Sequence, residues 1–238
     1  MHPRRRFASP FAVLLTLALA PAAHAAPMDV TLHFGSLPSA QGFTYVATGA
    51  HAGVAEATVF AASGGSLTQN TIGQYAGTSG GGIFYQATGG ITTTEVKQLR
   101  VRARCLQVQG SSVYPQGQGG LLFSFATGSV QYGFSLTDSR IAVIQGAGYV
   151  LLAPTYDNTQ FHDYVFEYSP PSTTHLYRDG VLISSSTTGV AIAANRLLFG
   201  DSTGGANAHA QVSAFRFIQD VATPVPASTW GRVKALYR

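Results

Sequence analysis

Apolar and basic residues alternate without a break in the stretch Leu99-Arg100-Val101-Arg102-Ala103-Arg104-Cys105. Successive side chains of a β-strand point to opposite faces, so an alternation of period two predicts a strand with one buried and one solvated side. The apolar set would face a protein core, and the three arginines would line the outer surface. The stretch therefore favours a sheet that is covered on one side only.

The same alternation recurs in other parts of the chain. Tyr164, Phe166 and Tyr168 alternate with more polar residues, and so do the apolar residues of 131–136. About a dozen such strands, separated by turn residues, predict an all-β fold: an antiparallel, two-sheet β-sandwich of the jelly-roll type. Shorter runs predict further strands at 30–34, 43–47, 57–61, 83–86, 121–126, 141–144, 149–152, 197–200 and 212–218.

The turn Arg178-Asp179-Gly180-Val181 separates two apolar alternations. Asp-Gly in this position favours a two-residue type I′ hairpin, because both central residues must adopt a positive φ. We interpret this segment as a tight turn and not as a metal-binding loop.

Composition excludes several classes of protein. Only 10% of the 238 residues are charged, against about 25% in average soluble domains. Coiled coils and charged disorder are thereby excluded, and a single Cys excludes both an internal disulfide framework and a Cys-rich zinc module. Six of the 14 basic residues lie at 4–6 and 232–238, which leaves 8 against 10 acidic residues in between. The formal charge of +4 thus comes from the two ends, and no nucleic-acid partner is predicted.

Residues 1–25 have the pattern of a signal peptide. Arg4, Arg5 and Arg6 precede an apolar stretch at 11–20, and Ala23-His24-Ala25 is a cleavage signal of the A-x-A type. The stretch is shorter than the about 20 residues of a membrane span. We expect export by the Sec or the twin-arginine route, with a mature chain from about residue 26.

Residues 221–238 form a Pro-rich linker and a short basic tail. The tail resembles the C-terminal sorting signal of Gram-negative PEP-CTERM proteins, but Pro226 to Arg232 leave no room for a membrane helix. We therefore expect a degenerate signal on a secreted protein, outside the cell or at its surface, with the periplasm as the alternative location. A plain disordered terminus is the other interpretation of the tail.

Residues 26–220 would then form one domain, and its second half resembles LamG-like domains of the concanavalin A-like lectin and glucanase class. The resemblance lies in an aromatic-led strand at 161–168, a Tyr-x-Asp-Gly hairpin at 177–180, a strand ending in Gly at 197–200 and an alternating strand at 212–217. It implies a jelly roll and, through relatives of this kind, carbohydrate binding or carbohydrate cleavage.

A glycoside hydrolase needs two carboxyl groups about 5 to 9.5 Å apart. Asp163 and Glu167 share one face of a predicted strand, but four residues at about 3.3 Å each separate them by about 13 Å. No Glu-x-Asp-x-x-Glu strand occurs either. We therefore assign no catalytic residue.

Arg100, Arg102 and Arg104 would lie about 6 to 7 Å apart along one side of a strand. This spacing could follow an anionic polysaccharide, so the three arginines are the predicted ligand-binding residues. The same stripe keeps a polysaccharide lyase open as an alternative, although the Gln-x-His and Tyr/Lys-rich strands of alginate lyases of this fold are absent. An arginine ladder paired with its neighbours is the plainer explanation.

Many LamG-like domains hold a calcium ion at their rim, and the resemblance implies the same metal here. Asp201, which begins a Gly-rich loop, and Asp157, which lies in another loop, are the candidate ligands. No further cofactor is predicted. The prediction as a whole is a secreted, non-enzymatic β-sandwich that binds a glycan or extracellular polymer. A polysaccharide-degrading enzyme and a structural component of the cell surface or biofilm are the alternatives.

Overall fold

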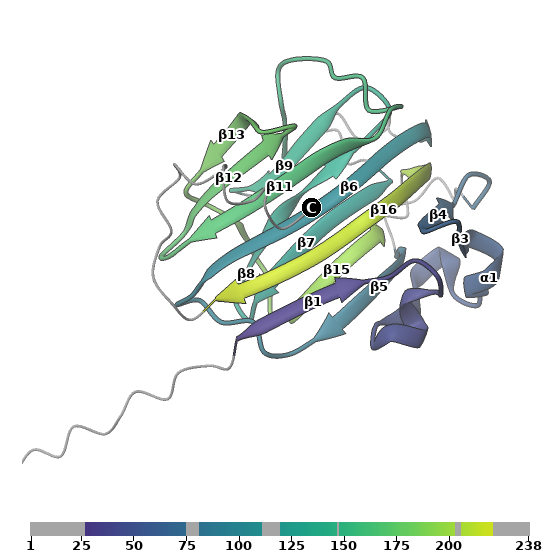
Figure 1. Cartoon of the computed structure of the whole chain (residues 1–238), viewed down its shortest axis with the longest axis horizontal. Helices are drawn as coiled ribbons and strands as arrows, with labels where there is room; N and C mark the ends of the chain where they lie inside the picture. The colour runs from purple at the N-terminus through teal and green to yellow at the C-terminus, as the bar shows by residue number, and fades with distance from the viewer. Residues whose placement is uncertain (1–26, 75–80, 111–119, 147, 203–205, 221–238) are drawn as a thin grey trace, which may run out of the picture.

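The computed structural model describes residues 27–74, 81–110, 120–146, 148–202 and 206–220. The predicted leader at 1–25 and the predicted tail at 221–238 lie outside these residues. Most of the regular structure is β-strand, and Figure 1 shows the strands arranged in two layers.

The front sheet, nearer the viewer in Figure 1, is built around two long antiparallel strands, β6 (Val96–Gln109) and β16 (Asn207–Asp220). Its order is β13-β12-β11-β6-β16-β4-β3, and β1 also pairs with β16. The other strands are β1 (Met28–Leu32), β3 (Phe60–Ser63), β4 (Ser66–Asn70), β11 (His162–Ser169), β12 (Thr173–Arg178) and β13 (Val181–Ser186).

The back sheet has the order β10-β9-β8-β7-β15-β5-β2, and β14 also pairs with β8. Its central strand β7 (Leu121–Thr127) is buried along its whole length, because apolar and small residues face both ways. The other strands are β2 (Thr44–Ala47), β5 (Ile83–Thr88), β8 (Val130–Leu136), β9 (Ile141–Gln145), β10 (Gly148–Leu151), β14 (Val190–Ala191) and β15 (Asn195–Asp201).

Aromatic side chains fill the space between the two sheets. Tyr164, Phe166 and Tyr168 of β11 are all buried, as their alternation predicted. The ring of Phe125 from the back sheet lies 6.0 Å from Phe166 and 5.6 Å from Phe217, which both come from the front sheet. The predicted all-β, antiparallel, two-sheet jelly-roll sandwich is thereby confirmed.

The predicted hairpin is also present. Arg178 pairs with Val181, and Asp179 and Gly180 have φ values of 51° and 82°. Both central residues therefore have the positive φ that a type I′ turn requires.

The predicted strand at 57–61 is wrong in its first half. A single helical turn, α1 (Glu56–Val59), comes first, and β3 follows it. Val59 and Phe60 are adjacent and both buried, so no true period of two exists there. The short 3₁₀ turns η1 (Pro38–Gln41) and η2 (Gly49–His51) also flank β2. None of the described helices is long and apolar enough to cross a membrane.

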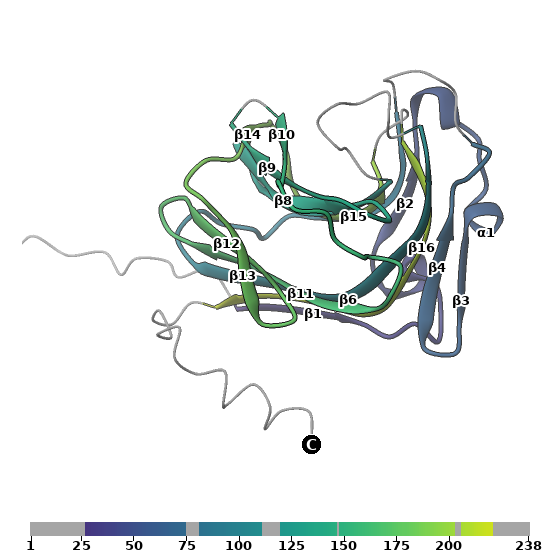
Figure 2. The same ribbon diagram turned by 90° about the horizontal axis from the view of Figure 1, so that it is seen from above.

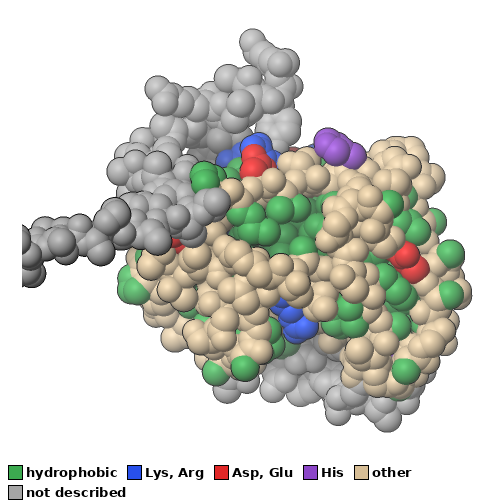
Figure 3. Space-filling model, turned by 90° about the horizontal axis from the view of Figure 1, so that it is seen from below, with side chains coloured by type: hydrophobic (Ala, Val, Ile, Leu, Met, Phe, Trp, Pro, Cys, Tyr) green, Lys and Arg blue, Asp and Glu red, His purple; other side chains and the backbone are tan. Residues whose placement is uncertain are grey.

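The two sheets curve in the same direction, with the back sheet nested inside the front sheet (Figure 2). The outer face of the front sheet is therefore convex and that of the back sheet is concave. Charged side chains are sparse on the face drawn in Figure 3, in line with a chain that is only 10% charged. The few charged side chains that do occur on the sheet faces therefore help to locate candidate binding sites.

Candidate functional site

Strand β6 places Arg100, Arg102 and Arg104 on the outer face of the front sheet, while its apolar residues are buried. This is the side of the strand that the alternation predicted. We call these three residues the arginine stripe. The outer face of the front sheet is convex (Figure 2), so the arginine stripe lies on the convex side of the sandwich and not within its concave side.

Side chains from neighbouring strands engage two of these arginines. Arg102 forms a salt bridge of 3.0 Å with Asp163 of β11. Arg104 donates from Nε to Gln211 of β16 at 2.9 Å, and its guanidinium carbon lies 4.6 Å from the centre of the Phe161 ring. These contacts hold both guanidinium groups against the sheet.

The third arginine lies beside a further ion pair. Arg100 donates from Nε to Gln98 Oε1 at 3.0 Å. Next to it, Arg216 binds the carboxylate of Asp29 through two hydrogen bonds of 2.9 and 2.5 Å. The hydrogen bond from Arg216 lowers the pKa of Asp29, and the charges of Arg216 and Arg100 act in the same direction. Anion binding by the stripe is not tested by these contacts and stays a prediction.

The two predicted calcium ligands belong to separate hydrogen-bond networks. Asp201 is fully buried, and its Oδ2 accepts hydrogen bonds from Thr71 at 2.7 Å and Asn207 at 2.8 Å. Asp157 is exposed, and its hydrogen bonds from Thr159 lower its pKa. Within the described ranges, no three His, Cys, Asp or Glu side chains are grouped so as to hold a metal ion. A calcium site stays a prediction.

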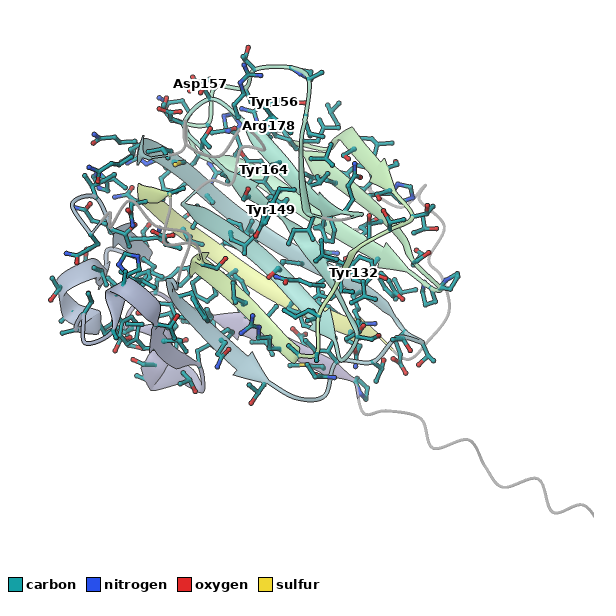
Figure 4. The ribbon with its side chains drawn as sticks, turned by 180° about the vertical axis from the view of Figure 1, so that it is seen from behind. Tyr132, Tyr149, Tyr156, Asp157, Tyr164 and Arg178 are labelled. Carbon is teal, nitrogen blue, oxygen red and sulfur yellow. The ribbon has the colours of Figure 1, made fainter. Side chains whose placement is uncertain are left out.

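The outer face of the back sheet is a site that the sequence did not reveal. A second hydrophobic cluster lies there, separate from the core between the sheets, and consists of Phe84, Leu122, Ile144 and Leu198. Tyr149 of the edge strand β10 packs against this cluster, and Figure 4 shows it lying over the middle of the sheet. Burial raises the pKa of the Tyr149 phenol.

A row of hydrogen-bonding side chains borders this cluster. We call Gln86, Ser124, Gln131 and Arg196 the polar row. They come from the neighbouring strands β5, β7, β8 and β15, and each alternates with core residues, so all four point outward. Arg196 donates from NH1 to Gln86 at 3.1 Å. Gln131 donates to the Ser124 hydroxyl at 2.9 Å.

Register places the four residues on two adjacent lines across the sheet. Gln86 and Ser124 both lie opposite Leu198 of β15, whereas Arg196 and Gln131 both lie opposite Ala126 of β7. Ser124 is buried, and Gln86, Gln131 and Arg196 are the members of the row that remain partly exposed. The row therefore presents planar amide and guanidinium groups beside a buried apolar cluster.

The outward-facing positions of the back-sheet strands carry no Asp or Glu among the described residues. An acid–base pair for glycoside hydrolysis would need two carboxyl groups at such a surface. The arrangement can bind a ligand through hydrogen bonds and apolar contact, but the described residues supply no such pair there.

Comparisons with known proteins bear on the fold alone. No protein-family model and no curated protein matches the chain. Its structure is similar to that of a carbohydrate esterase from Shiga toxin-encoding bacteriophage phi24B, at 13% identity over 80% of this chain and 100% of the other (TM-score 0.48). A prokaryotic β-1,3-1,4-glucanase from a mouse hindgut metagenome matches at 14% identity over 82% and 99% (TM-score 0.46).

A third similar structure is the binding domain of Paraclostridial Mosquitocidal Protein 1. It matches at 11% identity over 72% of this chain, with a TM-score of 0.46. The chain covers 43% of that structure, so it spans less than half of its length.

Proposed function

We propose that this protein binds a glycan chain on the outer face of the back sheet, without cleaving it. The observation that carries the proposal is the polar row, whose partly exposed Gln86, Gln131 and Arg196 lie beside Tyr149 and the buried cluster that it covers. Sugars present both hydroxyl groups and apolar C–H faces, and a site with planar hydrogen-bonding groups next to apolar side chains matches both.

Two features of the sequence support this function. The LamG-like order of motifs in residues 161–217 is one, because the resemblance implies a carbohydrate-related jelly roll. The predicted signal peptide is the other, since an exported protein meets extracellular polymers. In this proposal the protein acts outside the cell or at its surface.

A pair of matched glutamine variants tests the site. Gln131→Leu removes a member of the polar row, and Gln98→Leu removes a glutamine from the convex face of the front sheet. Full-length protein is screened on a glycan array with and without calcium, and hits are measured by titration calorimetry. We expect Gln131→Leu to weaken binding about two- to tenfold, as for the loss of one or two neutral hydrogen bonds, and Gln98→Leu to leave it unchanged.

Two outcomes would contradict the proposal. One is the absence of binding to any glycan in either condition. The other is the reverse pattern, in which Gln98→Leu and not Gln131→Leu weakens binding, because that would move the site to the arginine stripe. Incubation with alginate, pectate and β-glucans is expected to produce neither new reducing ends nor unsaturated uronates, and either product would favour the enzyme alternative.

A further inference from the structure

Arg196 is the one charged residue among the described strand positions on the outer face of the back sheet. It is half-buried, and its guanidinium lies 5.7 Å from the centre of the Phe84 ring. Burial lowers the pKa of Arg196, and no carboxylate among the described residues opposes this shift. A cation in such surroundings is costly to keep unless an anion compensates it.

The hydrogen-bonding capacity of Arg196 is largely unused. A guanidinium has five N–H donors, whereas the described residues give Arg196 one acceptor, Gln86 Oε1 on NH1. Its Nε is buried and has no hydrogen-bond partner. The arginines of the convex face differ, because Arg102 and Arg216 each have a carboxylate partner.

We infer that the glycan bound by this face is acidic and that a carboxylate or sulfate group of the sugar pairs with Arg196. The planar fork of a guanidinium suits both oxyanions, and such charge-assisted bonds are stronger than neutral ones. Gln86 fixes the orientation of the fork, and the apolar surface around Phe84 lowers the local dielectric and so strengthens the pair. The inference rests on the proposed function and names the ligand class of the same site.

The test compares acidic and neutral ligands that share the same sugar backbone. Full-length protein is titrated with polygalacturonate and with its fully methyl-esterified form, and with dextran sulfate and unmodified dextran. We expect at least one acidic member to bind about tenfold or more tightly than its neutral counterpart. The two pairs also separate a carboxylate from a sulfate as the recognised group. Binding of both neutral members at equal or higher affinity would overturn the inference but leave the proposed function standing.

Three variants test which residue recognises the acidic group of the ligand. Arg196→Gln should remove the preference for the acidic ligand, and Arg196→Lys, which keeps the charge but loses the fork, should weaken it partially. Arg216→Gln, a matched loss of charge on the convex face, should keep the preference. Near-ultraviolet circular dichroism checks that each variant folds. An acid preference that survives Arg196→Gln, or that disappears in Arg216→Gln instead, contradicts the inference, and a chain that binds no glycan at all contradicts the proposed function itself.

Discussion

Lys97 is a fully buried cation on the inner side of the front sheet. Its Nζ donates to the backbone oxygen of Glu95 at 2.7 Å and lies 4.6 Å from the centre of the Tyr168 ring. Burial lowers the pKa of Lys97 to about 8, and the charge of Glu95 opposes this only in part. The folded protein therefore releases the amine proton at a lower pH than the unfolded chain, which keeps the ordinary lysine pKa.

This difference predicts that Lys97 contributes more to stability as the pH increases. Below pH 8 the amine is charged in both states, and the folded state bears the full cost of burying it. Between pH 8 and 9.5 the folded amine loses its proton while the unfolded one keeps it, so this group alone should add about 2 kcal/mol to the free energy of unfolding. The Cys105 thiol acts in the opposite direction over the same range, because burial raises its pKa, and the tyrosines of the unfolded chain do so as the pH approaches 10. Urea denaturation at pH 7, 8 and 9.5 therefore compares the parent with a variant that lacks the amine.

Lys97→Met separates this group from all others. Methionine has a similar volume and no charge, so the variant should be at least as stable as the parent at pH 7 and should lose the increase toward pH 9.5. A variant that retains the increase, or one that is less stable at pH 7, would show that Lys97 is not the group responsible.

At the scale of single elements, β8 depends on a glycine in its centre. A Cβ on Gly133 would lie 2.2 Å from the backbone oxygen of Phe123 in the neighbouring strand β7. Gly133→Ala should therefore force β7 and β8 apart and destabilise the protein by about 2 kcal/mol or more. Gly148→Ala is the matched control, since a Cβ there meets nothing within 4 Å and should change stability by less than about 0.5 kcal/mol. Thermal melting followed by circular dichroism compares the two, and equal melting temperatures would refute the close-approach argument.

The β12–β13 hairpin depends on the side chain of its first turn residue. Asp179 accepts a hydrogen bond of 3.0 Å from the backbone N–H of Asp163, and its other oxygen lies 2.7 Å from Nδ1 of His162. Asp179→Ala loses both contacts and must keep a positive φ, so we expect a loss of about 1 to 2 kcal/mol in the free energy of unfolding. Asp179→Asn keeps an acceptor for Asp163 and tolerates the turn, so urea denaturation should find it closer to the parent. An alanine variant as stable as the asparagine variant would contradict this role.

These elements show which parts of the fold a single sequence specifies. The hairpin at 178–181 was predictable because its turn residues act within four positions of the chain. Strand β4 was missed, since Leu67 is its one large apolar residue and its pairing with β16 comes from far along the chain. At 57–61 a short alternation of apolar residues predicted a strand, although Val59 and Phe60 are adjacent and both buried and residues 56–59 form a helical turn.

The candidate site was less predictable than the fold, for the same reason. The alternation correctly predicted that the Arg102 side chain points outward. Its partner Asp163 lies 61 positions away, so no local pattern in the sequence connects the two residues. Strand β7 is apolar on both faces, which indicated a buried strand without showing what borders its outer side. Arg196, directly before the run Leu197-Leu198-Phe199, was the one local signal of the polar row: a single charge beside an otherwise apolar strand.

At the scale of the whole molecule, the two sheets share one core. Phe125 of β7 contacts Phe166, Tyr168 and Phe217 of the front sheet, at centroid distances of 6.0, 6.0 and 5.6 Å. Neither sheet can bury its inner face without the other. The sandwich should therefore unfold as one cooperative unit, and the convex and concave faces should be lost together.

A substitution in this shared core tests that expectation. Phe125→Ala should reduce the free energy of unfolding by about 3 to 5 kcal/mol, because the removed ring leaves a cavity that both sheets line. Urea denaturation is followed by far-ultraviolet circular dichroism for the strands and by near-ultraviolet circular dichroism for the tyrosines. We expect both signals to change at one midpoint in parent and variant, with the variant's midpoint shifted to lower urea. Two separated transitions would mean that one sheet persists alone, and the back sheet could then present its polar row without support from the front sheet.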